Sequence, residues 1–173
     1  MIILSLNLRG VGGAPKLSHF RKMIQSSSLD IIFFQETMLD NLKAKDFFLK
    51  CCPSWCCVAS DVLGLSGGLI SGWNPLVVDF QASLCSVGIL LEGRIKGITE
   101  SVKLLNCYGP YKDRLSFWKT LEGSGLLNEL GLVMGGDLNF TTFSRKIWGV
   151  KARSDQLASY FSSLFSSANL VDI

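Results

Sequence analysis

Four short, almost wholly apolar runs in this chain each end on a polar residue. They are Ile2–Leu6 before Asn7, Ile31–Phe34 before Gln35 and Glu36, Leu104–Cys107 before Tyr108, and Leu132–Gly136 before Asp137. Runs of this length, rich in β-branched and aromatic residues, predict strands that are buried on both faces. A buried strand can offer a carboxylate or an amide to solvent only at its end. Four such ends in one small domain therefore predict a single shared site.

The rest of the pattern alternates helices with strands at both ends of the chain and places consecutive strands in the middle. Periodicity predicts helices at about Lys16–Gln25, Leu39–Lys50 and Asp113–Glu122 and a final helix after Ser154, with Asp113 and Ser154 as candidate caps. The strand at Trp55 should form a hairpin with Gly67–Trp73, and Leu76–Leu84, Val87–Leu91 and Ser101–Tyr108 an antiparallel meander. This order predicts an α/β fold of mixed α+β character, with a mixed sheet or a pair of sheets and helices outside, in one domain over residues 1–173.

Composition narrows the class of protein. The 173 residues are enough for one domain with a real core, and 48% hydrophobic with 18% charged residues argues against disorder. The net charge of +3 comes from scattered basic side chains, so it permits contact with nucleic acid without requiring it. No segment approaches the roughly 20 apolar residues of a membrane helix, and the amino terminus lacks a secretory signal. We therefore expect an intracellular protein, with the nucleus as one location.

The six cysteines raise the question of a zinc site. Cys51-Cys52 and Cys56-Cys57 flank a short segment that contains Pro53. Structural zinc sites more often show Cys-x-x-Cys spacing or nearby histidines, and the single histidine, His19, is distant in sequence. The sequence favours the alternative, in which the segment after Trp55 is a strand of small apolar residues and all six thiols stay reduced.

The polar strand ends carry the donors that metal-assisted phosphate chemistry needs. Glu36 offers a carboxylate to a magnesium ion, and Asn7 could add a carbonyl oxygen or hold Glu36 in place. Asp137 could orient a water for attack on phosphorus, while Asn139 and Tyr108 could hydrogen-bond the phosphate. The set favours metal-assisted hydrolysis of a phosphate ester. Each residue taken alone also fits a purely structural role at a strand end or turn.

Six segments in order carry a resemblance to a known family. They are Leu6–Gly10, Gln35–Thr37, Ser66–Gly68, Asn106–Pro110, Gly135–Asn139 and Asn169–Asp172. They resemble the successive motifs of the endonuclease/exonuclease/phosphatase (DNase I-like) superfamily, and most closely those of the apurinic-endonuclease-like domain of plant LINE-type retrotransposons. The resemblance spans essentially the whole chain.

This resemblance implies a four-layered α/β sandwich of two mixed sheets flanked by helices. It implies a DNA phosphodiester as substrate and Mg²⁺ as cofactor, with Mn²⁺ as an alternative. Glu36 would be the main metal ligand with Asn7 beside it, and Asp137 would orient the water with Asn139 as its partner. Tyr108 would act at the phosphate, and Arg9 would join Asn139 and Tyr108 in binding the substrate.

The chain departs from the family pattern at its carboxy terminus. It ends at Ile173 before the family's Ser-Asp-His motif, and His19 on the first predicted helix cannot take the place of that histidine. We therefore expect a carboxy-terminally truncated domain with an impaired reaction rate, and the sequence leaves open whether it is an active enzyme. Two alternatives stand beside it: a non-catalytic fragment with at most weak nucleic-acid binding, and a phosphatase of the same superfamily.

Overall fold

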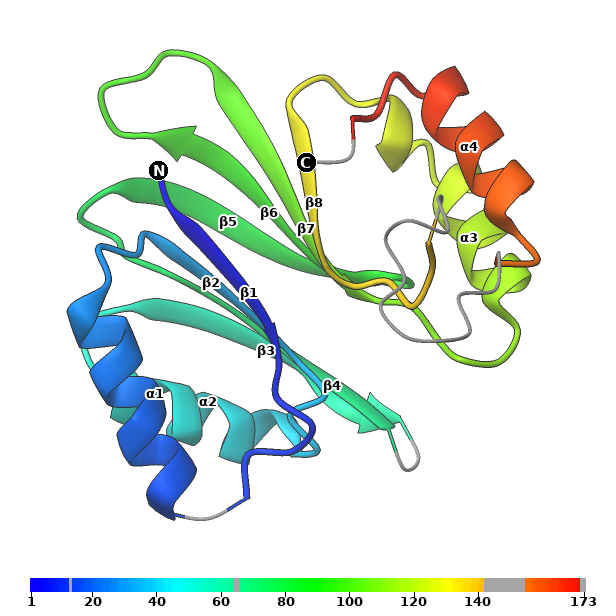
Figure 1. Cartoon of the computed structure of the whole chain (residues 1–173). Coiled ribbons are helices and arrows are strands. Elements are labelled where there is room, and N and C mark those ends of the chain that lie inside the picture. Colours follow the sequence, from blue (N-terminus) through cyan, green and yellow to red (C-terminus); the bar gives the residue numbers. More distant parts are fainter. Residues whose placement is uncertain (13, 64–65, 142–154, 172–173) are drawn as a thin grey trace. The chain divides into compact units, whose positions relative to one another are not determined.

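A computed structural model describes residues 1–12, 14–63, 66–141 and 155–171. The chain divides into two compact units (Figure 1). The sheet unit comprises Met1–Tyr108 and Leu130–Asp137, and the helical unit comprises Gly109–Glu129 and Leu138–Ile173.

The sheet unit contains two four-stranded mixed sheets. The first has the order β1-β2-β4-β3 and is built from β1 (Ile3–Asn7), β2 (Ile31–Gln35), β3 (Cys56–Leu63) and β4 (Ser66–Trp73). The second has the order β5-β6-β7-β8 and is built from β5 (Val78–Cys85), β6 (Gly88–Ile95), β7 (Ser101–Tyr108) and β8 (Leu132–Asp137). In each sheet one pair is parallel, β1 with β2 and β7 with β8, and the other pairs are antiparallel. The predicted hairpin and meander are confirmed.

The alternation of side chains along β2 explains how the layers of this unit are held together. Ile31 and Phe33 point into a core shared with the second sheet, where Phe80, Ile89 and Leu91 are buried. Ile32 and Phe34 point the other way, into a core made with the two helices α1 (Ala14–Ser26) and α2 (Asn41–Cys51), which lie beside the first sheet in Figure 1. Since β2 separates two cores, all five of its residues are buried.

The prediction that all four strands are buried on both faces is wrong for β1 and β8. Both strands stand at the end of their sheet's order, and their residues are mostly half-buried, with Val133 on β8 37% exposed. A strand with one neighbour in its sheet receives less cover than a central strand.

The predicted fold class is confirmed: the chain is an α/β sandwich of two mixed sheets with helices. No helix in the described part of the chain is both long and apolar enough to cross a membrane.

The helical unit is organised around aromatic side chains. It contains α3 (Arg114–Gly123), the short 3-10 helix η1 (Leu126–Asn128) and α4 (Ala158–Ser167). Trp118 on α3 and Phe161 on α4 are fully buried, with ring centroids 5.1 Å apart, and Phe140 lies 4.3 Å from Phe161. The Trp118–Phe161 contact is edge-to-face and the Phe140–Phe161 contact is tilted. Aromatic pairs of this kind add to the free energy of burying the rings.

The structure tests one of the two predicted helix caps, Asp113 before α3. Asp113 does occupy the position before α3, but its backbone is left-handed, with φ of 53°, and its side chain makes no capping hydrogen bond. The prediction that its side chain caps the helix is therefore wrong. Ser154 lies outside the described residues, and the residue that directly precedes α4 is Leu157.

Asp155 ties the chain before α4 to α3. Its carboxylate accepts hydrogen bonds from Arg114 Nη2 at 2.5 Å, from the backbone N–H of Leu157 at 2.9 Å and from that of Thr141 at 3.4 Å. Burial raises the pKa of Asp155, but the hydrogen bonds from Arg114 and the two backbone groups outweigh burial, so the pKa is lowered overall. The ionised form is therefore favoured by folding.

This lowered pKa predicts acid sensitivity of the helical unit. Because the folded pKa lies below the unfolded one, the carboxylate stabilises the fold above about pH 4 and loses this effect as the pH falls through the folded pKa. The Asp155→Asn variant should be less stable at neutral pH by about 1–3 kcal/mol and lose less stability on acidification. Unfolding followed by the NMR signals of the buried Trp118 ring measures both. Equal acid sensitivity of the two proteins would contradict the assignment.

Candidate active site

The register of the two parallel strand pairs aligns the polar residues at the strand ends. In the first sheet Asn7 at the end of β1 is opposite Gln35 at the end of β2. In the second sheet Tyr108 at the end of β7 is opposite Asp137 at the end of β8. Parallel neighbours present their carboxyl ends at the same edge of a sheet, so each sheet carries its candidate residues at one edge.

A side-chain hydrogen bond joins these two edges. Asn7 Nδ2 donates to Asp137 Oδ2 over 2.7 Å, between residues that are 130 positions apart in the sequence. The other end of the Asn7 amide is also used, because its Oδ1 accepts from the backbone N–H of Arg9 at 2.9 Å. Asn7 is thus fixed by a contact on each side and fixes the Asp137 carboxylate in turn. This bond places the first and fourth predicted strand ends in one site.

Glu36 follows directly after β2 in an unusual backbone conformation. Its φ is +49°, which is uncommon for a residue with a side chain, and it is only 8% exposed. Its carbonyl accepts from the N–H of Gly10 at 2.7 Å, and Leu8 N–H donates to Gln35 O at 2.8 Å. The segment after β1 therefore stays hydrogen-bonded to the segment after β2. Residues with a side chain that are held in left-handed backbone occur often at functional sites.

The Ser-Gly-Gly segment supports this loop from β4. Thr37 N–H donates to Gly68 O at 3.1 Å, and Met38 N–H donates to Gly67 O at 3.3 Å. A Cβ on Gly68 would lie 2.4 Å from Thr37 Oγ1, and the φ of Gly68 is +79°. Glycine is therefore required here both for the close approach and for the backbone angle. Thr37, the residue directly after Glu36, is fully buried, and this fixes the backbone next to Glu36.

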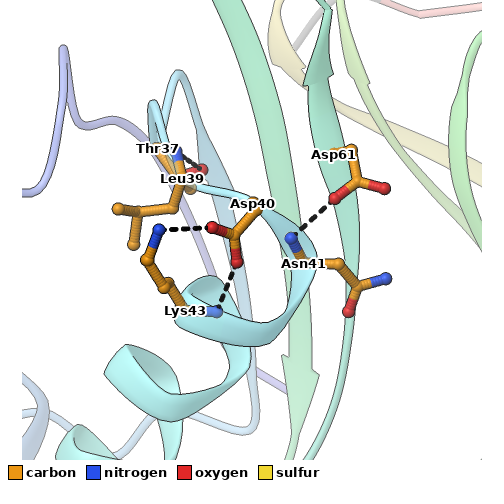
Figure 2. Close-up of polar contacts among 6 residues, drawn as sticks. All are labelled: Thr37, Leu39, Asp40, Asn41, Lys43 and Asp61. Carbon is orange, nitrogen blue, oxygen red and sulfur yellow. Dashed lines mark hydrogen bonds and ion pairs between the residues drawn. The ribbon is translucent and has the colours of Figure 1, made fainter.

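Figure 2 shows how the same loop continues into α2. Leu39 N–H donates to Thr37 Oγ1 at 3.4 Å, and Asp40, the cap of α2, accepts from Lys43 N–H at 2.9 Å. Asp61 on β3 accepts from the N–H of Asn41 at 2.7 Å. The hydrogen bond from the Lys43 side chain, with help from its backbone N–H, lowers the pKa of Asp40. The loop that carries Glu36 is thus anchored at its far end by two carboxylates.

The other predicted site residues are placed as follows. Tyr108 is half-buried at the end of β7, and Arg9 is exposed, with a φ of +46°. Asn139 belongs to the helical unit, where it adopts a left-handed turn with φ of +50° and donates from Nδ2 to Gly109 O at 2.6 Å. A Cβ on Gly109 would lie 2.2 Å from Leu138 O, so the chain after β7 and the chain after β8 run in close contact there.

Two residues of the site region were missed as functional candidates. Gln35 and Asn106 are buried amides, 1% and 0% exposed, and Gln35 Nε2 donates to Asn106 Oδ1 at 2.8 Å. The available signal was a polar amide next to apolar residues, with Gln35 directly after Ile31–Phe34 and Asn106 between Leu105 and Cys107. Such a residue must find partners in the core, because an unpaired buried amide is costly.

The donors at the joined strand ends suit a hard cation. Glu36, Asp137 and Asn7 supply carboxylate and amide oxygens, and Mg²⁺ is usually bound by one or two carboxylates together with waters. Among the described residues, no group of three or more His, Cys, Asp or Glu side chains forms a metal site. Carboxylate and amide oxygens are the donor types compatible with a magnesium ion that keeps several of its waters.

The cysteines and the histidine do not have the environment of a zinc site. Burial raises the pKa of Cys52 to about 12 and also raises the pKa of Cys51 and of Cys57. Zinc binds thiolates, so raised thiol pKa values disfavour zinc at this cluster. All six cysteines are free thiols. His19 is exposed on α1, with its ring 6.4 Å from that of Phe20.

Comparison with known proteins relates this geometry to solved structures. No protein-family model and no curated protein sequence matches the chain. Its structure is similar to the AP endonuclease LMAP from Leishmania major, with a TM-score of 0.78 and 14% identity over 98% of this chain and 67% of that one. It is similar to the endonuclease domain of TRAS1, a telomere-specific non-LTR retrotransposon, with a TM-score of 0.63 and 15% identity over 96% of this chain and 71% of that one.

A third solved structure is the 3′ phosphatase NExo from Neisseria bound to a product DNA hairpin. The TM-score is 0.62 and the identity 18%, over 95% of this chain and 70% of that one. All three identities are low, so the likeness concerns the arrangement of the chain. Together these structures show that this chain has the α/β-sandwich fold of DNase I-like nucleases and phosphatases.

Proposed function

We propose that this chain is a divalent-metal-dependent phosphodiester hydrolase that nicks DNA. One observation carries the proposal: the 2.7 Å hydrogen bond from Asn7 Nδ2 to Asp137 Oδ2, which brings a carboxylate of one sheet to the strand ends of the other. The solved structures of similar fold include an AP endonuclease, a retrotransposon endonuclease domain and a phosphatase bound to a DNA hairpin. These likenesses support DNA as substrate. The proposal that the domain derives from a plant LINE-type retrotransposon rests on the sequence motifs.

In this proposal Glu36 and Asn7 hold a magnesium ion, which polarises the scissile phosphate when bound. Glu36 contributes a carboxylate that is already shielded from bulk water, since it is only 8% exposed. The Oδ1 of Asn7 keeps a second lone pair beyond the one that accepts from Arg9.

The remaining residues act on the water and the phosphate. Asp137, oriented by the Asn7 amide, accepts a hydrogen bond from the attacking water and aligns it with phosphorus. Tyr108, opposite Asp137 on β7, donates to a phosphate oxygen as negative charge develops there. Asn139 is proposed for the same role from its sequence motif. The exposed Arg9 contacts the DNA backbone through its guanidinium group.

Plasmid nicking tests the proposal directly. Purified protein is incubated with supercoiled plasmid and Mg²⁺, Mn²⁺ or a chelator, beside the Asp137→Ala variant. The matched control is Asp79→Ala. Asp79 is exposed on β5 and lies opposite Arg94 in the β5–β6 register, and this register position is at the opposite end of the second sheet from Tyr108. Metal-dependent nicking that is retained in the control and lost in Asp137→Ala is the expected result.

The same assay separates the two alternatives. Turnover of a soluble phosphate ester without plasmid nicking would identify a phosphatase instead, an outcome favoured by the likeness to NExo. Absence of turnover on both substrates, together with no heat of magnesium binding in calorimetry, would reject the enzymatic proposal and leave weak nucleic-acid binding.

A further inference from the structure

We infer that Gln35 and Asn106 are positioning residues, which lock the register between the two sheets so that Asn7 can orient Asp137. The inference concerns the same site and rests on the proposed function for its catalytic consequence. Its structural part, the dependence of the Asn7–Asp137 contact on a buried amide pair, can be measured without any activity.

The pair lies at the centre of a buried polar network between the sheets. Gln35 Nε2 donates to Asn106 Oδ1 at 2.8 Å and also approaches Ser5 Oγ on β1 at 3.2 Å. Asn106 Nδ2 donates to two groups of β4, Ile70 O at 2.9 Å and Ser71 Oγ at 3.2 Å. The network therefore joins β1, β2 and β4 of the first sheet to β7 of the second. Both amides and Ser71 are at most 1% exposed.

This network differs in kind from the apolar contacts around it. Phe33, Ile89 and Leu104 fill the same space between the sheets, and such contacts are non-directional, so they resist separation of the sheets more than small sliding movements. An amide-to-amide hydrogen bond has a preferred length and angle, and in a low-dielectric interior it is costly to break. A buried polar pair of this type can specify one arrangement among several apolar packings.

The position of the pair links it to the candidate site. Gln35 is opposite Asn7 in the β1–β2 register, and it directly precedes Glu36. Asn106 is opposite Gly135 in the β7–β8 register, and Gly135 is two residues before Asp137. The two cross-sheet hydrogen bonds, Gln35 to Asn106 and Asn7 to Asp137, thus join the same strand pairs within one or two residues of each other. Sliding of one sheet would lengthen both together.

The test replaces the pair by apolar side chains of similar size. In the Gln35→Met, Asn106→Leu double variant neither amide is left unpaired, while the Ser71 hydroxyl loses its hydrogen bond from Asn106, so the fold should persist with some loss of stability. The first readout is hydrogen exchange of the Asn7 side-chain amide by NMR, which we expect to become about tenfold faster. The second is nicking, for which we expect kcat to fall about tenfold while KM changes little. The core control is Leu91→Met, at a fully buried position of the same sheet-to-sheet core, and it should change neither.

The outcomes separate this inference from the proposed function. Unchanged Asn7 exchange in a folded double variant overturns the inference, whatever the nicking assay shows. Faster Asn7 exchange in a chain that does not nick at all supports the structural part and counts only against the proposed function. Should the double variant not fold, Ser71→Ala removes one acceptor of Asn106 Nδ2 and leaves two backbone acceptors, Ile70 O and Phe34 O. Asn7 exchange should then rise by about two- to threefold, and an unchanged rate overturns the inference.

Discussion

The Glu36→Gln variant should lose DNA nicking by about 100-fold or more while keeping its fold. Glutamine has nearly the shape of glutamate, so the 8% exposed side chain still fits between its neighbours. The neutral amide oxygen is a much weaker ligand for a hard divalent cation than a carboxylate. Calorimetry should therefore show that the heat of magnesium binding disappears together with the nicking activity.

The control for this charge removal is Glu92→Gln. Glu92 is exposed on β6 and pairs with Lys103 Nζ at 3.2 Å, near the start of β7 and away from Tyr108. Its neutralisation should leave both nicking and magnesium binding unchanged. If Glu36→Gln bound magnesium as the unmodified chain does, Glu36 would not be a ligand and the assignment of the metal site would be wrong.

The Gly136→Ala variant should unfold the second sheet's outer strand, at a cost of about 3 kcal/mol or more. A Cβ on Gly136 would lie 1.8 Å from Cys107 O, and the backbone φ of +140° is one that residues with a side chain rarely adopt. Alanine can relieve the clash only by moving β8 away from β7. Asp137, the next residue, would then lose its register with Tyr108, so activity should fall with stability.

Urea denaturation of Gly136→Ala beside Gly123→Ala measures this effect. A Cβ on Gly123, the last residue of α3, would meet no atom within 4 Å. The same chemical change there should leave the chain as stable as before or more stable by up to about 1 kcal/mol. Similar unfolding midpoints for the two variants would show that β8 tolerates a side chain at position 136.

The candidate strand ends could be read from the sequence because a buried strand leaves a strong local signal. Ile31–Phe34 has no polar residue, so its change to Gln35 and Glu36 marks a strand end at an edge of the sheet. The same reasoning overestimated burial for β1 and β8, since an apolar run does not reveal whether a strand has one neighbour in its sheet or two. The Asp113 cap failed for a related reason: residue type favours a cap, but backbone conformation decides whether the side chain can reach.

The order of helices and strands, the α/β class and the polar residues at the strand ends can be read from the amino-acid sequence, because periodicity and turn residues act over a few neighbouring positions. Which of these residues come into contact is seen only in the folded chain. The contact between Asn7 and Asp137 spans 130 positions, and the amide pair Gln35 and Asn106 spans 71. Strand order and register between sheets arise from packing of the whole core, and no local pattern encodes them.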